Sequence, residues 1–174
     1  WVTVSRLVRG QLLSLKEMIE AFQQVVASGK ARYLGFSEWT AEQIQAAVDI
    51  AGPDLFVSSQ PQYSMLWRAP ESELFPLCEA NGISQIVWSP LAQGVLTDRY
   101  LAGIPEGSRA SRPGSMSPHQ LSEETMAKVR ALNEIAQRRG QTLAQLALAW
   151  TLRDPRMTST LVGSSSVSQL EDSL

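Results

Sequence analysis

The chain has 174 residues, 44% of them hydrophobic, and a formal net charge of −2 at pH 7. This is enough apolar material for one packed domain, and the scattered, nearly balanced charges exclude a polyanion-binding surface and hence nucleic acid as a partner. No apolar run approaches the ~18 residues of a membrane-spanning helix, and no signal peptide is visible. The single cysteine, Cys78, excludes an intrachain disulfide and is typical of a reducing compartment. We therefore expect a cytoplasmic protein without membrane insertion, and we predict no metal site.

Capping boxes mark several helix starts, because a Ser or Thr is followed three residues later by Glu or Gln. Such pairs begin at Ser14, Thr40, Thr142 and Ser166, each followed by apolar residues at helical spacing. In chain order the predicted helices are 14–29, 40–52, 71–81, 122–140, 142–150 and one from 166 onward. In the third of these, Pro76 must lie in the first turns or bend the axis.

Short apolar runs between these helices are the predicted strands, at residues 32–36, 55–58, 85–88 and 158–162. Residues 2–4 are a candidate for a fifth strand. Strands that alternate with helices are typical of βαβ units with a parallel sheet and right-handed crossovers. Residues 102–121, rich in Gly and Pro, are too long for a plain connection and are expected to form a functional lid or to be disordered.

Two predicted strands stop abruptly in small, turn-forming residues. The strand that ends at Trp88 is followed by Ser-Pro and a glycine loop, and the last strand is followed by a Gly-Ser-Ser-Ser turn and a helix. Such a turn presents backbone N–H groups and the positive end of a helix dipole to an anion. In a (β/α)₈ barrel the loops after strands seven and eight form the usual phosphate site. We therefore predict a nucleotide-binding part of a barrel, since a complete barrel needs about 250 residues.

Four segments, in order, resemble the aldo-keto reductases: GKARYLGFSEW (29–39), QPQYSML (60–66), WSPLAQGVLTDRY (88–100) and QLALAWTLRDPRMTSTLVGSSSVSQLEDSL (145–174). The third and fourth are most similar to the branch that contains the voltage-gated potassium channel β-subunits and their bacterial relatives. The resemblance covers residues 14–174 and leaves 1–13 as an unmatched lead segment, interpreted as a remnant of strand four. It implies an α/β fold, namely the C-terminal half (strands five to eight with their helices) of a (β/α)₈ TIM barrel, from an oxidoreductase that uses NADP(H).

The resemblance also implies cofactor-binding roles at the strand ends. Ser37 and Gln60 match residues that hydrogen-bond the nicotinamide carboxamide, a group that needs both a donor and an acceptor; from the residues alone, ordinary strand-end polarity is the favoured alternative. Trp88 matches the aromatic platform under the nicotinamide ring, with a core tryptophan as the alternative. The other matched positions are Ser89, Pro90, Leu91, Ala92, Gln93 and Gly94 at the pyrophosphate, Arg99 and Arg109 at the phosphates, and Gly163, Ser165, Gln169 and Asp172 around the 2′-phosphate and adenosine.

Several positions depart from the family pattern. Glu38 stands where the family has an asparagine, so it adds a negative charge beside the predicted nicotinamide position and can accept but not donate a hydrogen bond. Gln169 stands where many members have a basic residue, although the channel-β-like branch also has glutamine. The preference for NADP or NAD therefore stays open. Ser173 replaces an adenine-contacting asparagine, and Gly107 lacks a side chain that packs on the cofactor in that branch.

The family's catalytic Asp, Tyr, Lys and His precede the matched region, so the resemblance implies no catalytic residue in this chain. His119 is the only histidine, and it lies in the Gly/Pro-rich stretch. The first hypothesis is part of an NADPH-dependent reductase of small carbonyl compounds, inactive alone. The alternatives are a cofactor-binding regulatory subunit resembling the channel β-subunits, or an inactive fragment. We also expect a half-barrel to self-associate, because open edges and an uncovered parallel sheet invite pairing.

Overall fold

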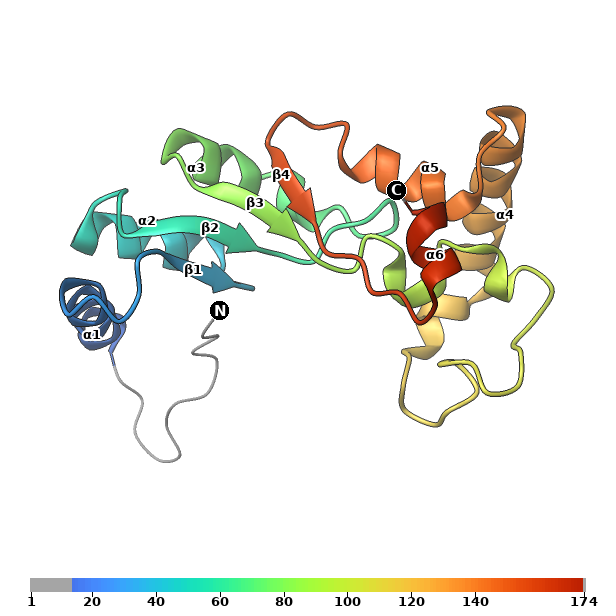
Figure 1. Cartoon of the computed structure of the whole chain (residues 1–174), viewed down its shortest axis with the longest axis horizontal. Coiled ribbons are helices and arrows are strands. Elements are labelled where there is room, and N and C mark those ends of the chain that lie inside the picture. The colour runs from blue at the N-terminus through green and yellow to red at the C-terminus, as the bar shows by residue number, and fades with distance from the viewer. Residues whose placement is uncertain (1–13, 174) are drawn as a thin grey trace. The chain divides into compact units, whose positions relative to one another are not determined.

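The computed structural model describes residues 14–173, so the lead segment 1–13 and the candidate strand at 2–4 lie outside the described residues. In chain order (Figure 1) the elements are α1 (Leu15–Ala27), β1 (Leu34–Ser37), α2 (Ala41–Ala51), β2 (Phe56–Gln60), α3 (Leu74–Ala80), β3 (Ser84–Val87), α4 (Glu123–Arg138), α5 (Leu143–Thr151), β4 (Met157–Thr160) and α6 (Val167–Asp172).

Residue contacts divide the chain into two compact units. Unit 1 comprises the described residues up to Gln62 together with 69–87 and 156–159. Unit 2 comprises 63–68, 88–155 and the described residues from Thr160 on. Each unit has its own hydrophobic core.

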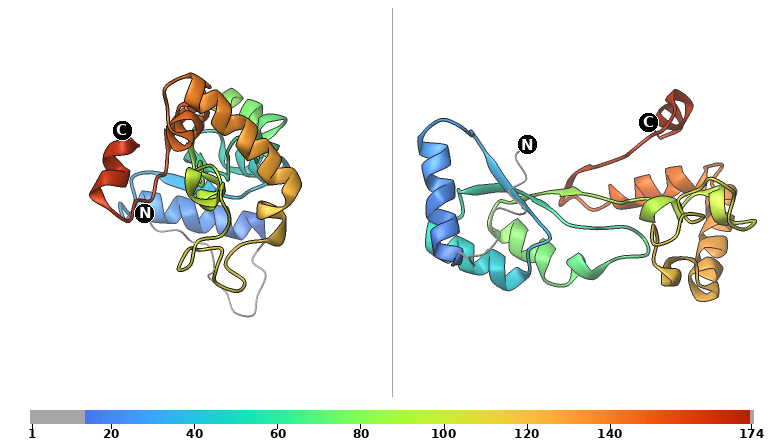
Figure 2. Two further views of the ribbon diagram at one scale, coloured as in Figure 1. Left: turned by 90° about the vertical axis from the view of Figure 1, so that its right-hand side faces the viewer. Right: turned by 90° about the horizontal axis from the view of Figure 1, so that it is seen from below.

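The four strands form one sheet in the order β1-β2-β3-β4. β1 pairs in parallel with β2, and β2 in parallel with β3. The helices α2 and α3 lie in the two crossovers between these strands, as parallel pairing requires, because adjacent parallel strands cannot be joined by a tight turn. Within unit 1, the helices α1, α2 and α3 pack along one side of the strands (Figure 2). The predicted α/β class with a parallel sheet is confirmed.

The helix starts predicted at Ser14, Thr40, Thr142 and Ser166 are confirmed as capped N-termini. The Oγ of Ser14 accepts from the Glu17 N–H while the Ser14 N–H donates to the Glu17 carboxylate at 2.8 Å. Thr40 and Thr142 form the same reciprocal pairs with the glutamines three residues on. These contacts satisfy backbone N–H groups that have no partner inside the helix. Because the capping pairs are local, the sequence pattern alone was sufficient to find them.

Some element boundaries differ from the prediction. α3 begins at Leu74 rather than at Glu71, because residues 69–71 form a separate 3₁₀ turn. Pro76 then lies in the first turn of α3, where its missing N–H removes no intrahelical bond. β1 and β2 start later than predicted and end later, at Ser37 and Gln60, whereas β3 and β4 end earlier than predicted, at Val87 and Thr160. Residues 102–121 contain one short 3₁₀ helix, Pro118–Leu121, and otherwise turns.

The core of unit 1 is an aromatic cluster between the sheet and its helices. Phe36 stacks on Trp39 with ring centroids 4.9 Å apart. Phe56 meets Phe36 edge-on at 5.5 Å and Phe22 at 5.8 Å. β1 and β2 approach closely beside this cluster, since a Cβ on Gly35 would lie 2.4 Å from the Ser58 Oγ. Any larger residue at this position would require the Ser58 side chain to move.

The core of unit 2 joins the segment after Trp88 to the helices α4 and α5. Val95 and Leu96 are fully buried and pack with Val129 of α4 and Leu143 of α5. Tyr100 belongs to the same cluster, and its hydroxyl accepts from the Ala110 N–H at 3.4 Å. The predicted cofactor loop is therefore anchored at its far end by core side chains. Among residues 14–173, no helix combines the length and apolar character that crossing a bilayer requires.

Candidate functional site

Ser37 and Gln60, the predicted carboxamide-binding residues, lie side by side in unit 1. They are register partners at the ends of β1 and β2, and the Ser37 hydroxyl donates to the Gln60 carbonyl oxygen at 2.8 Å. Both residues are half-buried. The Ser37 oxygen can still accept hydrogen bonds, and the Gln60 side-chain amide has both a donor and an acceptor. The pair can therefore bind a planar amide at this edge of the sheet.

Glu38 follows directly in an unusual backbone conformation. Its φ is +59°. This value lies in the left-handed region, which residues other than glycine rarely adopt. The Glu38 Oε1 accepts from the Gln62 N–H at 2.7 Å, and a hydrogen bond to an ionised acceptor of this length is a strong one. A carboxylate is thus held across the ends of β1 and β2, beside the Ser37–Gln60 pair.

The loop 89–94 of unit 2 concentrates backbone strain. Ser89, Ala92 and Gln93 have φ values of +60°, +47° and +60°, and Gly94 has +97°. The turn is closed by a hydrogen bond of 2.9 Å from the Gly94 N–H to the Leu91 carbonyl. Left-handed conformations at residues other than glycine are costly and are found most often at functional sites. The loop therefore has the character of a preorganised ligand-binding segment.

The residues on either side of this loop are also placed by specific contacts. Trp88 is half-buried, and its carbonyl accepts from the Tyr63 N–H at 3.1 Å. Arg109, from the Gly/Pro-rich stretch, donates through Nη1 to the Gln93 Oε1 at 3.2 Å. The structure thus brings together two predicted phosphate-contacting residues that are far apart in the chain. Arg99 is exposed in the 3₁₀ turn Asp98–Tyr100.

The turn after β4 is closed by its own side chains. Both the N–H and the Oγ of Ser165 donate to the Gln169 Oε1 at 2.9 Å. Ser166 caps α6 by accepting from the Gln169 N–H at 3.3 Å. Gly163 and the other residues of this segment are exposed. Ser165 and Gln169 are thus neighbours as predicted, but the Ser165 donors already hold the Gln169 side chain, and an anion would have to displace it.

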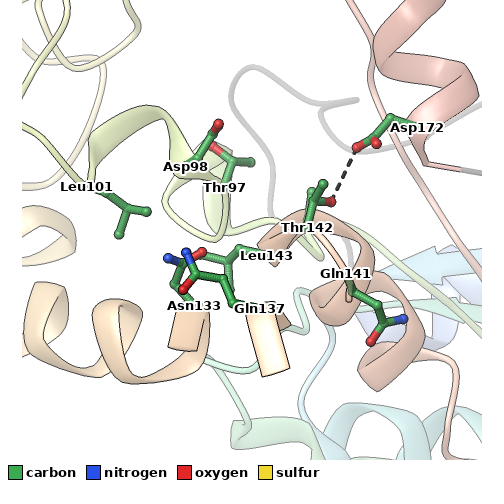
Figure 3. Close-up of a pocket in the computed structure, with 10 residues that line it drawn as sticks. Thr97, Asp98, Leu101, Asn133, Gln137, Gln141, Thr142, Leu143 and Asp172 are labelled. Carbon is green, nitrogen blue, oxygen red and sulfur yellow. Dashed lines mark hydrogen bonds between the residues drawn. The ribbon is translucent and has the colours of Figure 1, made fainter. Parts of the chain in front are cut away.

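Asp172 is held at the start of α5. Its Oδ2 accepts from the Thr142 hydroxyl at 3.3 Å (Figure 3), and its Oδ1 accepts from the Gln145 Nε2 at 3.2 Å. A carboxylate at a helix N-terminus also interacts favourably with the helix dipole. From the sequence, Thr142 and Gln145 were recognised only as a capping pair, and no local pattern indicates that they also hold α6.

A cavity of about 330 Å³ lies beside Asp172 in unit 2 (Figure 3). Its wall combines apolar, amide and carboxylate side chains: Thr97, Asp98, Leu101, Asn133, Gln137, Gln141, Thr142, Leu143, Ala144 and Asp172. The amide residues from α4 and the turn after it were not singled out in the sequence, because they occupy ordinary polar helix positions there.

The family model described as "Aldo/keto reductase family" matches residues 4–174. The chain belongs to the aldo/keto reductase family. The match begins inside the lead segment 1–13, ahead of the four segments that resemble the family. The resemblance stated from the four segments is thereby confirmed.

Two kinds of named protein are similar to this aldo/keto reductase chain. It is 40% identical over 168 residues to "L-glyceraldehyde 3-phosphate reductase" of Escherichia coli strain K12, covering 92% of this chain and 48% of the relative. It is also 40% identical over 168 residues to "Putative voltage-gated potassium channel subunit beta" of Schizosaccharomyces pombe, covering 92% and 49%. The chain thus spans about half the length of the curated relatives it matches.

A solved structure supports the same fold. A crystal structure of a thermostable aldo-keto reductase with the inhibitor epalrestat matches with a TM-score of 0.65 and 26% identity, over 92% of this chain and 48% of that one. The chain therefore corresponds to half of a reductase barrel. Within its described residues, no group of three or more His, Cys, Asp or Glu side chains could hold a metal ion.

Proposed function

We propose that this chain is the NADP(H)-binding part of an aldo-keto reductase that transfers hydride between the cofactor and a small carbonyl substrate, and that it has no catalytic residue of its own. The observation that carries the proposal is the strained loop 89–94, in which Gln93 is held by Arg109. Strain of this kind persists where a ligand-binding geometry is preorganised, and the loop belongs to the segment that resembles the family's pyrophosphate-binding motif.

Unit 1 has a donor and acceptor set that fits the nicotinamide carboxamide. The Ser37 oxygen and the Gln60 amide lie together at the strand ends, and Glu38 adds an acceptor beside them. When bound, NADPH supplies the hydride; the role of these residues is to orient the carboxamide and thereby the ring.

Unit 2 has groups that fit the phosphates and the adenosine. We assign Arg99 and Arg109 to the phosphates, since a guanidinium offers a fork of donors. We assign Gly163, Ser165 and Gln169 to the 2′-phosphate, and the cavity beside Asp172 to the adenine, because it combines apolar walls with carboxylate acceptors.

A calorimetric titration with 2′,5′-ADP tests the phosphate assignments. We expect Arg109→Ala to weaken binding about tenfold, since a charge-assisted hydrogen bond is lost at an exposed position. Ser165→Asp should weaken it further, because a carboxylate then faces the 2′-phosphate. Arg138→Ala is the control, because it removes the same charge from the exposed end of α4. It should leave the Kd within about twofold, since an isolated exposed charge contributes little. Comparison with 5′-AMP measures the preference for the 2′-phosphate.

Absence of wild-type binding at millimolar ligand, or unchanged affinity in both variants, would show that these residues do not form a working phosphate site. The folded state of each variant is checked by circular dichroism, so that a loss of affinity is not confused with a loss of structure.

A cofactor-binding regulatory subunit is the second candidate function. It is favoured by the 40% identity to a putative potassium channel subunit beta. The gene sequence upstream of Trp1 separates the reductase from a third candidate, an inactive fragment. In-frame Asp, Tyr, Lys and His motifs of the family favour the reductase, whereas a stop codon favours an inactive fragment.

We propose that the chain, taken alone, self-associates. Within the described residues, β1 and β4 are the edges of the sheet, and Val57 of β2 is 37% exposed. In unit 2, Leu161 and Val167 are 45% and 72% exposed. Parallel sheets are normally covered on both faces, and an unpaired edge strand can hydrogen-bond to a strand of another chain. Sedimentation at micromolar concentration should give a dimer or larger species, and a single monomeric species would contradict the proposal.

We place the protein in the cytoplasm. Cys78 is a free, fully buried cysteine, and burial raises the pKa of its thiol. Such a thiol is unreactive and needs no oxidising compartment. Cell fractionation with an antibody against the chain tests this placement.

A further inference from the structure

We infer that Glu38 is a specificity-determining residue that makes the nicotinamide site favour the oxidised cofactor over the reduced one. The inference rests on the proposed function, because it takes Ser37 and Gln60 as the residues that bind the carboxamide. It adds a property that the binding assignments alone do not supply, namely discrimination between two redox states of one ligand.

The geometry places a negative charge at the strand ends. Glu38 is the residue after Ser37, whose hydroxyl lies 2.8 Å from the Gln60 carbonyl oxygen. The Glu38 carboxylate does not extend freely into solvent, because its Oε1 accepts from the Gln62 N–H at 2.7 Å. Gln62 lies just beyond the end of β2. The charge is therefore fixed beside both carboxamide-binding residues, within unit 1.

The two forms of the ligand differ in charge at the ring. The oxidised nicotinamide ring carries a positive charge, and the reduced ring is neutral, while the carboxamide, phosphates and adenosine are the same in both. A fixed carboxylate attracts the positive ring, whereas its contact with the carboxamide NH₂ is available to both forms. The charge thus lowers the free energy of the oxidised complex selectively.

The backbone at this position supports a functional role. Glu38 has a φ of +59°, a conformation that asparagine and glycine adopt more readily than glutamate. A residue held against its conformational preference, with its carboxylate tethered, is typical of sites where strain persists for function. The consequence is a lower midpoint potential for the bound couple, so that bound NADPH is a stronger reductant than free NADPH.

The test compares the Kd of NADP⁺ with that of NADPH for the 174-residue chain, measured by calorimetry for the wild type and two variants. In Glu38→Gln the amide oxygen can still accept from the Gln62 N–H, so the variant removes mainly the charge. Glu38→Asn removes the charge and suits the left-handed backbone, so it covers the case in which Glu38→Gln folds poorly. Glu20→Gln removes one carboxylate from the exposed face of α1 and is the matched control.

We expect both Glu38 variants to weaken NADP⁺ binding about three- to tenfold and to leave NADPH binding within about twofold. The reason is that the attraction between the carboxylate and the positive ring is lost, and this attraction is partly screened by solvent. Glu20→Gln should change neither Kd. An unchanged ratio of the two Kd values in both Glu38 variants overturns this inference while the cofactor site stands. If the wild type binds neither form, the proposed function and this inference are both overturned.

Discussion

Purified alone, the 174-residue chain is expected to show no aldehyde-dependent oxidation of NADPH. Reduction of a carbonyl needs a positioned acid to protonate the oxygen, a contribution of about 10²- to 10⁴-fold in rate. Two of the candidate acids among the described residues, Tyr63 and Tyr100, are buried in the core of unit 2 and hold hydrogen bonds there. The Tyr63 hydroxyl accepts from the Arg153 guanidinium at 3.2 Å, and the Tyr100 hydroxyl accepts from the Ala110 N–H at 3.4 Å. His119 lies in the 3₁₀ helix Pro118–Leu121, within the Gly/Pro-rich stretch.

NADPH absorbance in the presence of a panel of aldehydes measures this rate. The same preparation must bind 2′,5′-ADP, so that inactivity is not confused with unfolding. Turnover by the pure chain that is abolished by Tyr63→Phe, Tyr100→Phe or His119→Ala would show that one of these residues is a general acid, and the assignment of catalysis to residues outside this chain would then be wrong.

Phe56→Ala is expected to destabilise unit 1 by about 3–5 kcal/mol, the usual cost of truncating a buried phenylalanine. Phe56 is 4% exposed and lies at the centre of the aromatic cluster, with ring contacts to Phe22, Phe36 and Trp39 at 5.8, 5.5 and 5.3 Å. The substitution leaves a cavity and removes these edge-to-face contacts. Urea denaturation followed by tryptophan fluorescence measures the change in unfolding free energy, with Trp39 as a reporter inside the cluster.

Tyr33→Ala is the matched control, because it truncates an aromatic side chain of unit 1 that is 75% exposed. Its effect should lie within about 0.5 kcal/mol, as for other exposed positions. Equal destabilisation by the two variants would mean that the aromatic cluster does not form the core of this unit.

The local features of this protein were predictable from the sequence. The caps at Ser14, Thr40 and Thr142 join residues three apart, and the apolar stripes behind them repeat with the helical period, so both depend on neighbours in the chain. The alternation of helices and strands then indicated a parallel sheet. The ends of β1 and β2 were located only to within a few residues, because a strand boundary depends on its pairing partner.

The arrangement of the candidate sites was decided by the tertiary structure. Ser37 meets Gln60, 23 residues away, Arg109 meets Gln93, 16 residues away, and Asp172 meets Thr142, 30 residues away. The backbone is left-handed at Glu38 and Gln93. Neither residue is a glycine, so the sequence does not indicate this conformation. Sequence reasoning therefore identified which residue types were available for binding. Which donors were already occupied, and where a charge was held, depended on contacts between distant segments that no local pattern encodes.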